Sequence, residues 1–583
     1  MKLLLVSPEL QESHFKFSKK AVKSFWFPRL SLTAIASLTP RDIEIILIDE
    51  SVDNIDFDMD VDLVGISVMT FLAPRAYEIA DRFRKRGVHV VLGGIHPSLL
   101  PDEAKEHADS VVIGEAEEIW PALIKDFKVG DLKPFYKMER YPDLKNLPFQ
   151  RRDLLKKGAY MTENCVQTTR GCPFNCEFCS VTQFCGNTYR YRPIEEVIKE
   201  VETLDGNFVA FVDDNIAGNR EYAKRLFSAL KPLKKIWGSQ GSLTMTNDPE
   251  LMRLAAESGC VSMFVGIETI SQENLKNANK NFNRAQEYEK QIKIFHDHGI
   301  MVNAGMIFGF DHDDETIFED TVEFLEKNMV ELTLFNILTP LPGTRLHKRM
   351  AAEGRIIDKD WAHYDGRHVV FKPTILSPEA LEDGFYWAYH RLYSFPSIIK
   401  RILPTRKRLV SRIFLNLGYR RMVNQIPDRE LSPFAAALKN LRGQFPAFET
   451  DNFIPNALYS IKEKVDTLSG RIDKYLDIKA SKDSNISKIH IELEGTMDRL
   501  NCKELIKRVT ETAKNVRVDI VINFENLRYI TPPALSTILD TDVIKKIAPY
   551  AELTYMNLKR SFQEALIGTL IPPTLVLYED TGE

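Results

Sequence analysis

The sequence predicts a multidomain α/β protein with a doubly wound N-terminal domain, a partial (β/α) barrel, a helical extension and a small C-terminal α/β domain. The length of 583 residues, at roughly 150 residues per domain, favours several folding units. Short apolar runs alternate with amphipathic segments in three separate stretches, which is typical of strands joined by helices. Apolar and charged fractions of 44% and 27% are those of folded globular domains.

Residues 1–126 are expected to form the doubly wound, Rossmann-like domain. Its strands are predicted over 3–7, 43–49, 63–68, 88–93 and 110–114, with a helix over 73–86. Ligands of such a sheet bind beyond the carboxyl ends of the strands. The candidate pocket residues in these loops are Ser67, Thr70, Gly93, Gly94, His96, Gly114 and Glu115. We interpret His96 as a hydrogen-bonding loop residue rather than a metal ligand.

Residues 127–160 are predicted to be a connector, because three prolines punctuate mixed polar sequence there. Residues 161–376 return to strand and helix alternation, which predicts the barrel-like domain. Its strands are expected over 208–212, 262–267, 302–308 and 332–338. The active site of such a barrel opens at the carboxyl ends of its strands.

Residues 377–480 are predicted to form a basic helical extension. No acidic residue occurs between Phe385 and Pro427. The basic residues gathered there are Lys400, Arg401, Arg406, Lys407, Arg408, Arg412, Arg420 and Arg421. Two interpretations are open: peripheral contact of 385–427 with an anionic membrane surface, or a solvated basic face packed on the barrel.

Residues 481–583 are predicted to form a separate small α/β domain. Strands are expected over 488–493, 519–524 and 553–557, with helices over 503–514 and 533–547.

The charge and the N-terminus exclude some classes of protein. A formal net charge of −5 argues against a dedicated nucleic-acid binder. Pro8, Glu9 and Glu12 interrupt the first apolar run before it reaches the length of a signal sequence. No stretch reaches the roughly 18 uninterrupted apolar residues of a membrane-spanning helix. We therefore expect a cytoplasmic protein.

The cysteines predict a metal site. Five of the seven cysteines lie within 165–185, which is not the pattern of a disulfide framework. Cys172, Cys176 and Cys179 form a C-x3-C-x2-C run in a loop after an expected strand. Three thiolates at this spacing can bind three irons of a cubane cluster and leave the fourth iron open. The alternative is a zinc site, with Cys165 or Cys185 as a fourth ligand.

This motif, with the aromatic Phe178 before its last cysteine, resembles the signature of the radical S-adenosylmethionine (SAM) superfamily. The resemblance implies a [4Fe-4S] cluster whose open iron binds SAM, a 5′-deoxyadenosyl radical, and a reductant such as ferredoxin or flavodoxin. Strand ends that follow match further family elements in order over roughly 160–350. The SAM-binding residues that the resemblance implies are Phe178, Asp213, Asp214, Asn215, Gly266, Glu268, Gly305 and Pro340.

The N-terminal domain is similar to that of the cobalamin-binding members of the superfamily, through GGIHPSLLPDEA and VVIGEAEEIWPALIKD. This resemblance implies that cobalamin binds at the pocket residues named above, whose glycines permit close backbone approach. The Asp-x-His-x-x-Gly motif of histidine-ligated cobalamin is absent. The alternative is a degenerate domain that only helps to close the barrel.

The overall layout resembles the enzymes that methylate hopanoids or bacteriochlorophyll side chains. It implies a cobalamin-dependent methyltransferase that acts on an unactivated carbon of a large apolar substrate, such as a lipid, hopanoid or tetrapyrrole. Two alternatives are open. One is a radical cyclase or carbon-carbon bond-forming enzyme with the same cofactors. The other is a non-catalytic iron-sulfur sensor with a partner-binding tail.

The C-terminal domain resembles a STAS domain through IELEGT and DIVINF. Where phosphorylated members carry Asp-Ser-Ser-Gly, this chain has Thr531-Pro532-Pro533-Ala534. Thr531 is more simply a helix N-cap followed by proline. We therefore expect a docking or dimerisation module rather than a phosphorylation switch.

Overall fold

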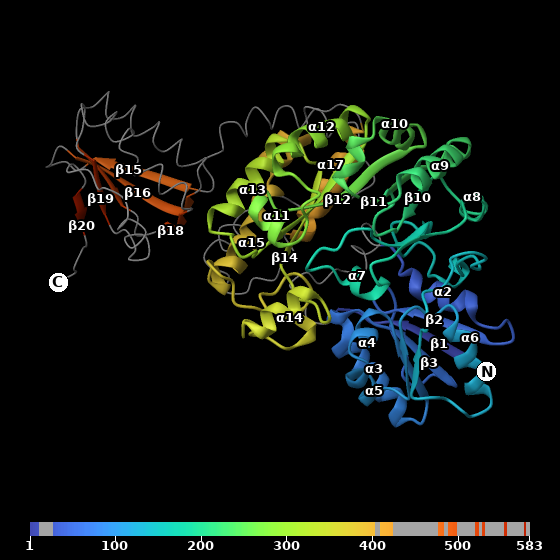
Figure 1. Ribbon diagram of the computed structural model, residues 1–583. Helices are drawn as coiled ribbons and strands as arrows, with labels where there is room; N and C mark the ends of the chain where they lie inside the picture. The colour runs from blue at the N-terminus through green and yellow to red at the C-terminus, as the bar shows by residue number, and fades with distance from the viewer. Residues whose placement is uncertain are drawn as a thin grey trace. The chain divides into compact units, whose positions relative to one another are not determined.

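The structure is a computed structural model that describes residues 1–10, 27–402 and 408–423, together with the backbone of strands between 476 and 578. The chain divides into two compact units, Met1–Ile426 and Pro427–Glu583. Figure 1 shows the first unit from its blue N-terminal sheet to its yellow helices.

The N-terminal sheet is parallel throughout, with the strand order β2-β1-β3-β4-β5-β6. Its strands are β1 (Lys2–Ser7), β2 (Glu44–Asp49), β3 (Leu63–Ser67), β4 (His89–Gly93), β5 (Ser110–Ile113) and β6 (Phe135–Lys137). Helices α3 (Ala73–Lys85) and α5 (Pro101–His107) pack on one face, and α2 (Leu30–Leu38) and α6 (Ile119–Lys128) on the other. The predicted doubly wound fold is confirmed.

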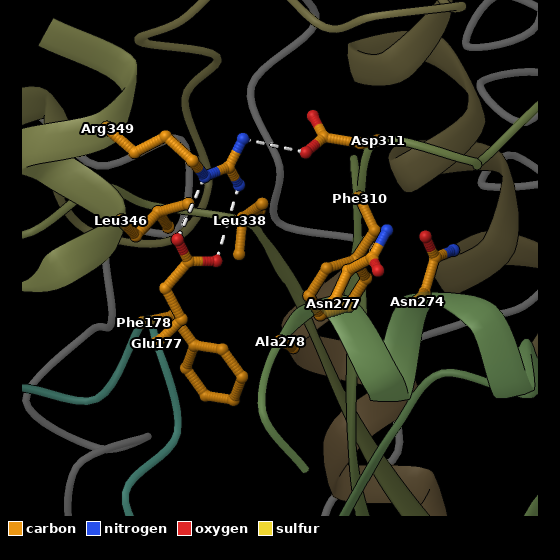
Figure 2. Close-up of a pocket in the computed structure, with 10 residues that line it drawn as sticks. All are labelled: Glu177, Phe178, Asn274, Asn277, Ala278, Phe310, Asp311, Leu338, Leu346 and Arg349. Atoms are coloured by element: carbon orange, nitrogen blue, oxygen red, sulfur yellow. Dashed lines mark hydrogen bonds and ion pairs between the residues drawn. The ribbon is translucent and has the colours of Figure 1, made fainter. Parts of the chain in front are cut away.

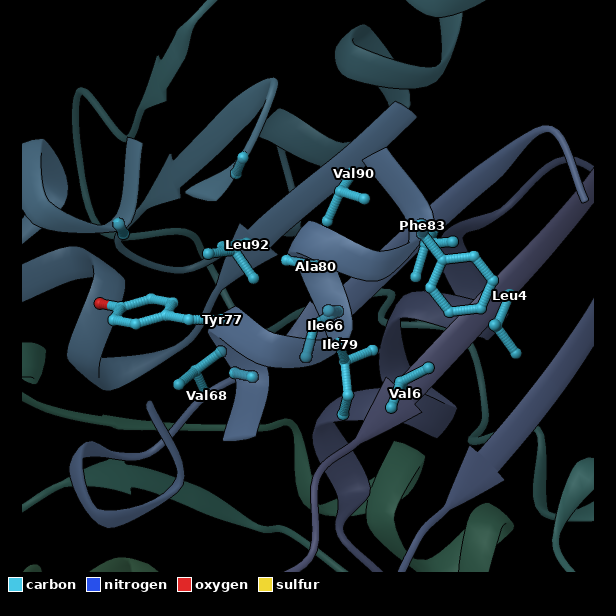
Figure 3. Packing of buried hydrophobic residues seen from close by; sticks show 14 of the residues in the cluster. Leu4, Val6, Ile66, Val68, Tyr77, Ile79, Ala80, Phe83, Val90 and Leu92 are labelled. Atoms are coloured by element: carbon cyan, nitrogen blue, oxygen red, sulfur yellow. The ribbon is translucent and has the colours of Figure 1, made fainter. Parts of the chain in front are cut away.

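Two apolar cores, one on each face, hold this sheet between its helices. Four consecutive side chains of β1, from Leu3 to Val6, are at most 1% exposed, as expected for a parallel strand covered on both faces. Figure 3 shows Tyr77, Ala80 and Phe83 of α3 lying over the strands. Burying a side chain of the size of Phe83 contributes about 2 kcal/mol.

The N-terminal domain extends beyond the expected boundary at 126. Helix α6 continues to Lys128, and β6 pairs with β5 inside the segment that we expected to be a connector. Tyr136 is buried in the second core, and its hydroxyl donates to Asp126 at 2.9 Å. A strand of three residues after Pro134 is too short to produce a recognisable alternation, so only the packing of Tyr136 reveals it.

The second sheet is the expected partial barrel, with six parallel strands in the order β14-β13-β12-β11-β10-β7. They are β7 (Cys165–Val166), β10 (Phe208–Phe211), β11 (Ile236–Gly241), β12 (Cys260–Glu268), β13 (Met301–Phe308) and β14 (Leu332–Ile337). The helices are α8 (Ile194–Glu202), α9 (Arg220–Leu230), α10 (Pro249–Glu257), α11 (Gln272–Asn277), α12 (Tyr288–Asp297), α13 (Thr316–Lys327) and α14 (Arg345–Ala352). The sequence did not predict β11, whose two glycines weaken the strand pattern.

The extension begins with α15 (Pro378–Leu392), α16 (Phe395–Ile402) and α17 (Leu409–Val423). Arg401 is fully buried and donates to the carbonyl oxygens of Val330 and Glu331 at 2.8 and 2.9 Å. Arg412 forms an ion pair with the Glu331 carboxylate at 2.5 Å. These two basic residues therefore pack the extension on the barrel. Within the described part of the chain, no helix has the length and apolarity needed to cross a membrane.

The second unit contains a mixed sheet with the strand order β15-β16-β17-β19-β20, in which β18 also pairs with β16. The strands are β15 (Leu476–Lys482), β16 (Lys488–Met497), β17 (Asp519–Asn523), β18 (Leu527–Ile530), β19 (Leu553–Met556) and β20 (Val576–Tyr578). The β15 and β16 pair is antiparallel, and the other pairs are parallel. The predicted helices over 503–514 and 533–547, and Thr531, lie outside the described residues.

Candidate active site

The three motif cysteines lie on a loop between β8 (Thr169–Gly171) and α7 (Ser180–Cys185). Strand β8 pairs with β9 (Tyr189–Tyr191) in an antiparallel ribbon, which closes the base of the loop. Gly171 has φ +84°, and a Cβ atom there would collide with the carbonyl oxygen of Thr188. The loop therefore needs glycine immediately before Cys172.

Contacts from two other segments hold the loop from outside. The backbone N–H of Glu177 donates to the carbonyl of Ala278 at 2.9 Å, and Asn279 Nδ2 donates to the carbonyl of Asn175 at 2.6 Å. Arg349 of α14 donates to the Glu177 carboxylate at 2.8 Å, as Figure 2 shows. These contacts hold the loop from two sides.

The burial and the pKa of the three motif thiols are compatible with binding an iron-sulfur cluster. Cys176 is 9% exposed, while Cys172 and Cys179 are half-buried. Burial raises the pKa of all three thiols, that of Cys179 to about 11, so positive charge is needed to make them thiolates. Iron would supply it. Among the described residues, no group of three or more Cys, His, Asp or Glu side chains is placed to hold a single metal ion. A four-iron cluster is larger and keeps its ligands further apart.

Cys165 and Cys185, which we considered as zinc ligands, are both buried. Cys165 lies in β7 with its Sγ 3.9 Å from the carbonyl oxygen of Thr162. Cys185 ends α7, six residues after Cys179. Burial raises the pKa of each thiol to about 12. Burial and a raised pKa are shared with the motif cysteines, so only the position of Cys165 and Cys185 outside the C-x3-C-x2-C loop sets them apart.

Lys280 lies beside the cysteines and was not singled out from the sequence. Its Nζ forms an ion pair with Glu268 Oε1 at 2.7 Å, and it is only 8% exposed. Glu268 ends β12 with φ +67° at a register shift after Gly266. The Lys280 charge lowers the pKa of Cys172 and Cys176, against the larger effect of burial. A single lysine in a loop carries no sequence signal of its own.

Asp213, Asp214 and Asn215 follow β10 and support the cysteine loop. Asp213 is fully buried, and one of its oxygens accepts from the N–H and hydroxyl of Thr168 at 2.9 and 3.0 Å. Asp214 accepts from the N–H of Gly171 at 3.2 Å. Asn215 Nδ2 lies 3.9 Å from the sulfur of Cys172. Their roles toward SAM stay predictions, and Asp213 already has a structural one.

A small pocket opens behind Phe178 (Figure 2). Phe178, Phe310 and Leu338 are among its apolar lining residues, and Arg349 bridges Glu177 to Asp311 beside them. The Phe178 and Phe310 rings lie edge to face with centroids 6.2 Å apart. The lining of this small pocket combines an apolar wall with a polar rim.

Two other predicted SAM residues belong to neighbouring strands, with Gly305 in the interior of β13 and Pro340 after the end of β14. In β13, a Cβ on Gly305 would lie 2.8 Å from the ring of Phe264, so the glycine makes room for this aromatic side chain. Pro340 is buried just after β14. Neither residue is among those that line the pocket behind Phe178.

The predicted cobalamin edge is formed by the loops after β3, β4 and β5. Ser98 joins two of them, because its hydroxyl donates to the carbonyl of Gly94 at 2.6 Å and accepts from the N–H of Gly114 at 2.9 Å. Gly94 has φ +104°, and a Cβ there would lie 2.8 Å from the carbonyl oxygen of Val68. Ser67 bonds to Ser31. Gly94 and Gly114 thus allow close packing within the domain, of the Gly94 loop on the Val68 backbone and of the Gly114 loop on Met138.

His96 and Thr70 belong to the packing of this domain. His96 is fully buried, with Nε2 at 3.0 Å from the Tyr77 hydroxyl and 3.1 Å from Glu103. Trp361, from the barrel side, donates to the same carboxylate at 3.0 Å. Thr70 is 4% exposed. His96 is hydrogen-bonded as expected, but it is fully buried in the short helix α4 (Ile95–Leu99) and is not a loop residue.

Glu115 has a different environment from the one we predicted. Glu115 is 5% exposed, and its carboxylate accepts hydrogen bonds from Arg170 at 2.7 Å and from Arg190 at 3.0 Å. Both arginines belong to the barrel domain, on β8 and β9. Glu115 therefore joins the loop after β5 to the ribbon that carries the cysteine loop.

Comparison with known proteins identifies the family. The model of the radical SAM superfamily matches residues 166–325, and that of the B12 binding domain matches residues 28–124. Bacteriochlorophyllide d C-12(1)-methyltransferase of Chlorobaculum tepidum is 33% identical over 69% of this chain and 89% of its own length. The chain belongs to the cobalamin-dependent radical SAM methyltransferases.

Two further similarities agree with this family. Bacteriochlorophyllide d C-8(2)-methyltransferase of the same organism is 32% identical over 66% of this chain and 89% of its own length. The structure of TsrM, a radical SAM methyltransferase from Kitasatospora setae with cobalamin and a [4Fe-4S] cluster bound, shares the fold. It has a TM-score of 0.53 and 17% identity, and it covers 77% of this chain and 96% of that chain.

The family defines the cofactors of this enzyme as a [4Fe-4S] cluster, SAM and cobalamin. The cluster and SAM supply radical chemistry, and cobalamin supplies a methyl carrier. The cyclase and sensor alternatives are not favoured by these comparisons.

Proposed function

We propose that this enzyme transfers a methyl group to an unactivated side-chain carbon of a tetrapyrrole. The observation that carries the proposal is the identity of 33% and 32% to two methyltransferases named for bacteriochlorophyllide d, over 89% of each. The sequence resemblance to hopanoid methylases leaves lipids as the competing substrate class.

The inner face of the barrel sheet suits an apolar macrocycle. Phe264 of β12, Ile307 of β13 and Leu334 of β14 occupy alternate positions on the half-buried face, whereas the other face is covered. Asn303 and Asn336 share the half-buried face and add polar groups. An apolar surface with few polar groups is typical of sites for large ring systems.

We assign the site residues as follows. Cys172, Cys176 and Cys179 hold the cluster. Lys280 with Glu268 supplies fixed charge next to it, and the Phe178 ring lies beside SAM. In the N-terminal domain, the backbone of Gly93, Gly94 and Gly114 faces cobalamin. Of the other predicted residues, Asp213 and Glu115 position loops rather than contact a cofactor.

The test is an anaerobic assay of the full chain with cluster, hydroxocobalamin and SAM, and with reduced flavodoxin or ferredoxin as the electron donor. A bacteriochlorophyllide and a hopanoid are supplied separately. Methylation of the tetrapyrrole alone, with one methyl group replacing one hydrogen in the product mass, supports the proposal. Methylation of the hopanoid alone overturns it, and a cyclised product without added methyl favours the cyclase.

We also propose contact with an anionic membrane surface through one face of α17. Val410, Phe414 and Leu417 recur at helical spacing and are 69%, 64% and 38% exposed. Arg421 on this helix and Arg408 just before it are exposed, and basic residues beside an apolar stripe favour anionic lipid. Vesicles with phosphatidylglycerol should co-sediment the enzyme, and vesicles of phosphatidylcholine should not. Phe414→Ser should weaken binding, while Val129→Ser, at an equally exposed apolar residue, should not. Equal binding of all variants contradicts the proposal.

For the C-terminal unit, we propose a docking or dimerisation role of the STAS type. Its support is the sequence resemblance together with the central parallel strands β16, β17 and β19. Sedimentation of the full chain should show a dimer or a complex with a partner protein. Incorporation of phosphate at Thr531 upon incubation with a kinase would instead favour a switch.

A further inference from the structure

The carboxylate of Glu115 is the meeting point of two arginines from the barrel domain. Arg170 and Arg190 lie opposite each other in the register of β8 and β9. They approach Glu115 at 2.7 and 3.0 Å, and the Glu115 side chain is only 3% exposed. Removal of this carboxylate takes away the ion pair of Arg190 and one of the two ion pairs of Arg170, which keeps Glu117 at 2.5 Å.

Arg170 connects this ion pair to the cysteine loop through the backbone. Its neighbours in the chain are both held, since Thr169 donates its hydroxyl to Asp213 at 2.7 Å and the Gly171 N–H donates to Asp214. Cys172 follows directly. Arg170 is therefore two residues from the first motif cysteine, in a segment that Asp213, Asp214 and Glu115 hold together.

On the other side, Glu115 connects to the predicted cobalamin edge. The preceding Gly114 donates its N–H to Ser98, and Ser98 donates to Gly94. Backbone and hydrogen bonds thus form a continuous path from the glycine loops of one domain to Cys172 of the other. Glu115 is the carboxylate that both arginines share, while Glu117 of the same loop forms a second ion pair with Arg170 at 2.5 Å.

We propose that Glu115 is a positioning residue that sets the distance and orientation between the cobalamin edge and the cluster loop through Arg170 and Arg190. Methyl transfer requires the two cofactors to act on one substrate carbon, so their relative position matters for the reaction. This inference rests on the family and its cofactors, and it holds for any substrate.

The experiment compares the wild-type enzyme with Glu115→Gln, which keeps the shape and removes the charge. In the protein without cofactors, hydrogen exchange of the amides over 167–172 and 189–192 should rise about tenfold in the variant, because the ribbon loses its anchor. Glu118→Gln is the matched control, since Glu118 lies three residues along the same segment and is 56% exposed. It should exchange like the wild type.

A second readout uses the loaded enzyme without substrate. The reduced cluster and cob(II)alamin each carry unpaired electron spin, and their magnetic interaction depends on the distance between them. In Glu115→Gln the interaction should change or broaden while iron and cobalt contents stay at the wild-type values. A merely structural role would lower the cofactor contents and leave the interaction of the remaining loaded molecules unchanged.

If Glu115→Gln does not fold, Arg190→Gln tests the same link from the barrel side, because Arg170 still holds Glu115. The expected result is then a smaller rise in exchange and the same kind of change in spin interaction. Wild-type exchange and wild-type spin interaction in the folded variants would overturn the proposal. An equal effect of Glu118→Gln would also overturn it.

Discussion

Asp213 accepts hydrogen bonds from both the backbone N–H and the hydroxyl of Thr169, with the hydroxyl at 2.7 Å. The same carboxylate oxygen accepts from Thr168. A residue that resemblance assigned to SAM therefore holds the strand that leads into the cysteine loop. The buried Asp213 carboxylate therefore supports the site. Its removal should lower the free energy of unfolding even in the absence of any effect on catalysis.

Asp213→Asn should destabilise the enzyme by about 2 kcal/mol or more, because an amide oxygen accepts these hydrogen bonds less well than a carboxylate oxygen. Denaturant unfolding of the protein without cofactors measures the change. Asp205→Asn, at an exposed position, should change stability by less than about 0.5 kcal/mol. Equal losses of stability in the two variants would contradict the supporting role of Asp213.

Stability should respond to the ionisation of Asp313. Burial raises the pKa of Asp313 to about 7, above its usual value of 3.8. The folded state then binds this proton more tightly than the unfolded state, so the stabilisation is present at low pH and is lost as pH rises from about 4 to about 7. Between pH 5 and pH 8, the free energy of unfolding of the wild type should fall by about 2 kcal/mol relative to that of Asp313→Asn. Parallel stability curves for the two proteins would contradict this.

Lys280→Gln should lower the retention of iron after anaerobic reconstitution and desalting. The substitution leaves Glu268 buried without its cation, and it removes the positive charge nearest the thiols. We expect at least a tenfold weaker affinity for SAM or a clear loss of iron, measured by equilibrium dialysis and metal analysis. Lys276→Gln, on the exposed side of α11, is the control and should keep both.

Cys176→Ala should abolish iron binding and leave cobalamin binding intact. The N-terminal cores are built from residues of that domain almost alone, so loss of the cluster does not unfold it. Iron, sulfide and cobalt analysis after reconstitution with hydroxocobalamin measures both. Cys185→Ala removes a buried thiol that we do not assign to the cluster, and it should keep its iron. Loss of iron from the Cys185→Ala variant would show that Cys185 also binds the cluster.

Gly171→Ala should cost more stability than Gly158→Ala, although both glycines have positive φ, +84° and +68°. At Gly158 nothing lies within 4 Å of the added Cβ, so only the left-handed backbone costs energy, about 1 kcal/mol. At Gly171 the Cβ also collides with the Thr188 carbonyl and must open the ribbon. Thermal unfolding and iron content should both fall for Gly171→Ala. Equal melting temperatures would show that the ribbon adapts.

Several elements were predictable because their signals are local. The strands of both parallel sheets carry continuous apolar runs such as residues 3–6, and the predicted bounds lie close to the observed ones for β3, β4 and β13. The cysteine spacing is also local, since three ligands on one loop need no tertiary information. The short strand β6 and the glycine-containing β11 lack such signals, and only pairing with their neighbours forms them.

The sequence by itself determined the class of the enzyme, because a contiguous cysteine motif and apolar periodicity are properties of neighbouring residues. Only the tertiary structure decided which charges meet. Glu115 with Arg170 and Arg190, and Lys280 with Glu268, join residues from separate segments. Single charged residues look alike in a sequence whether they are solvated or buried. Burial makes the partner of each charge matter, and burial is decided by the packing of the whole domain.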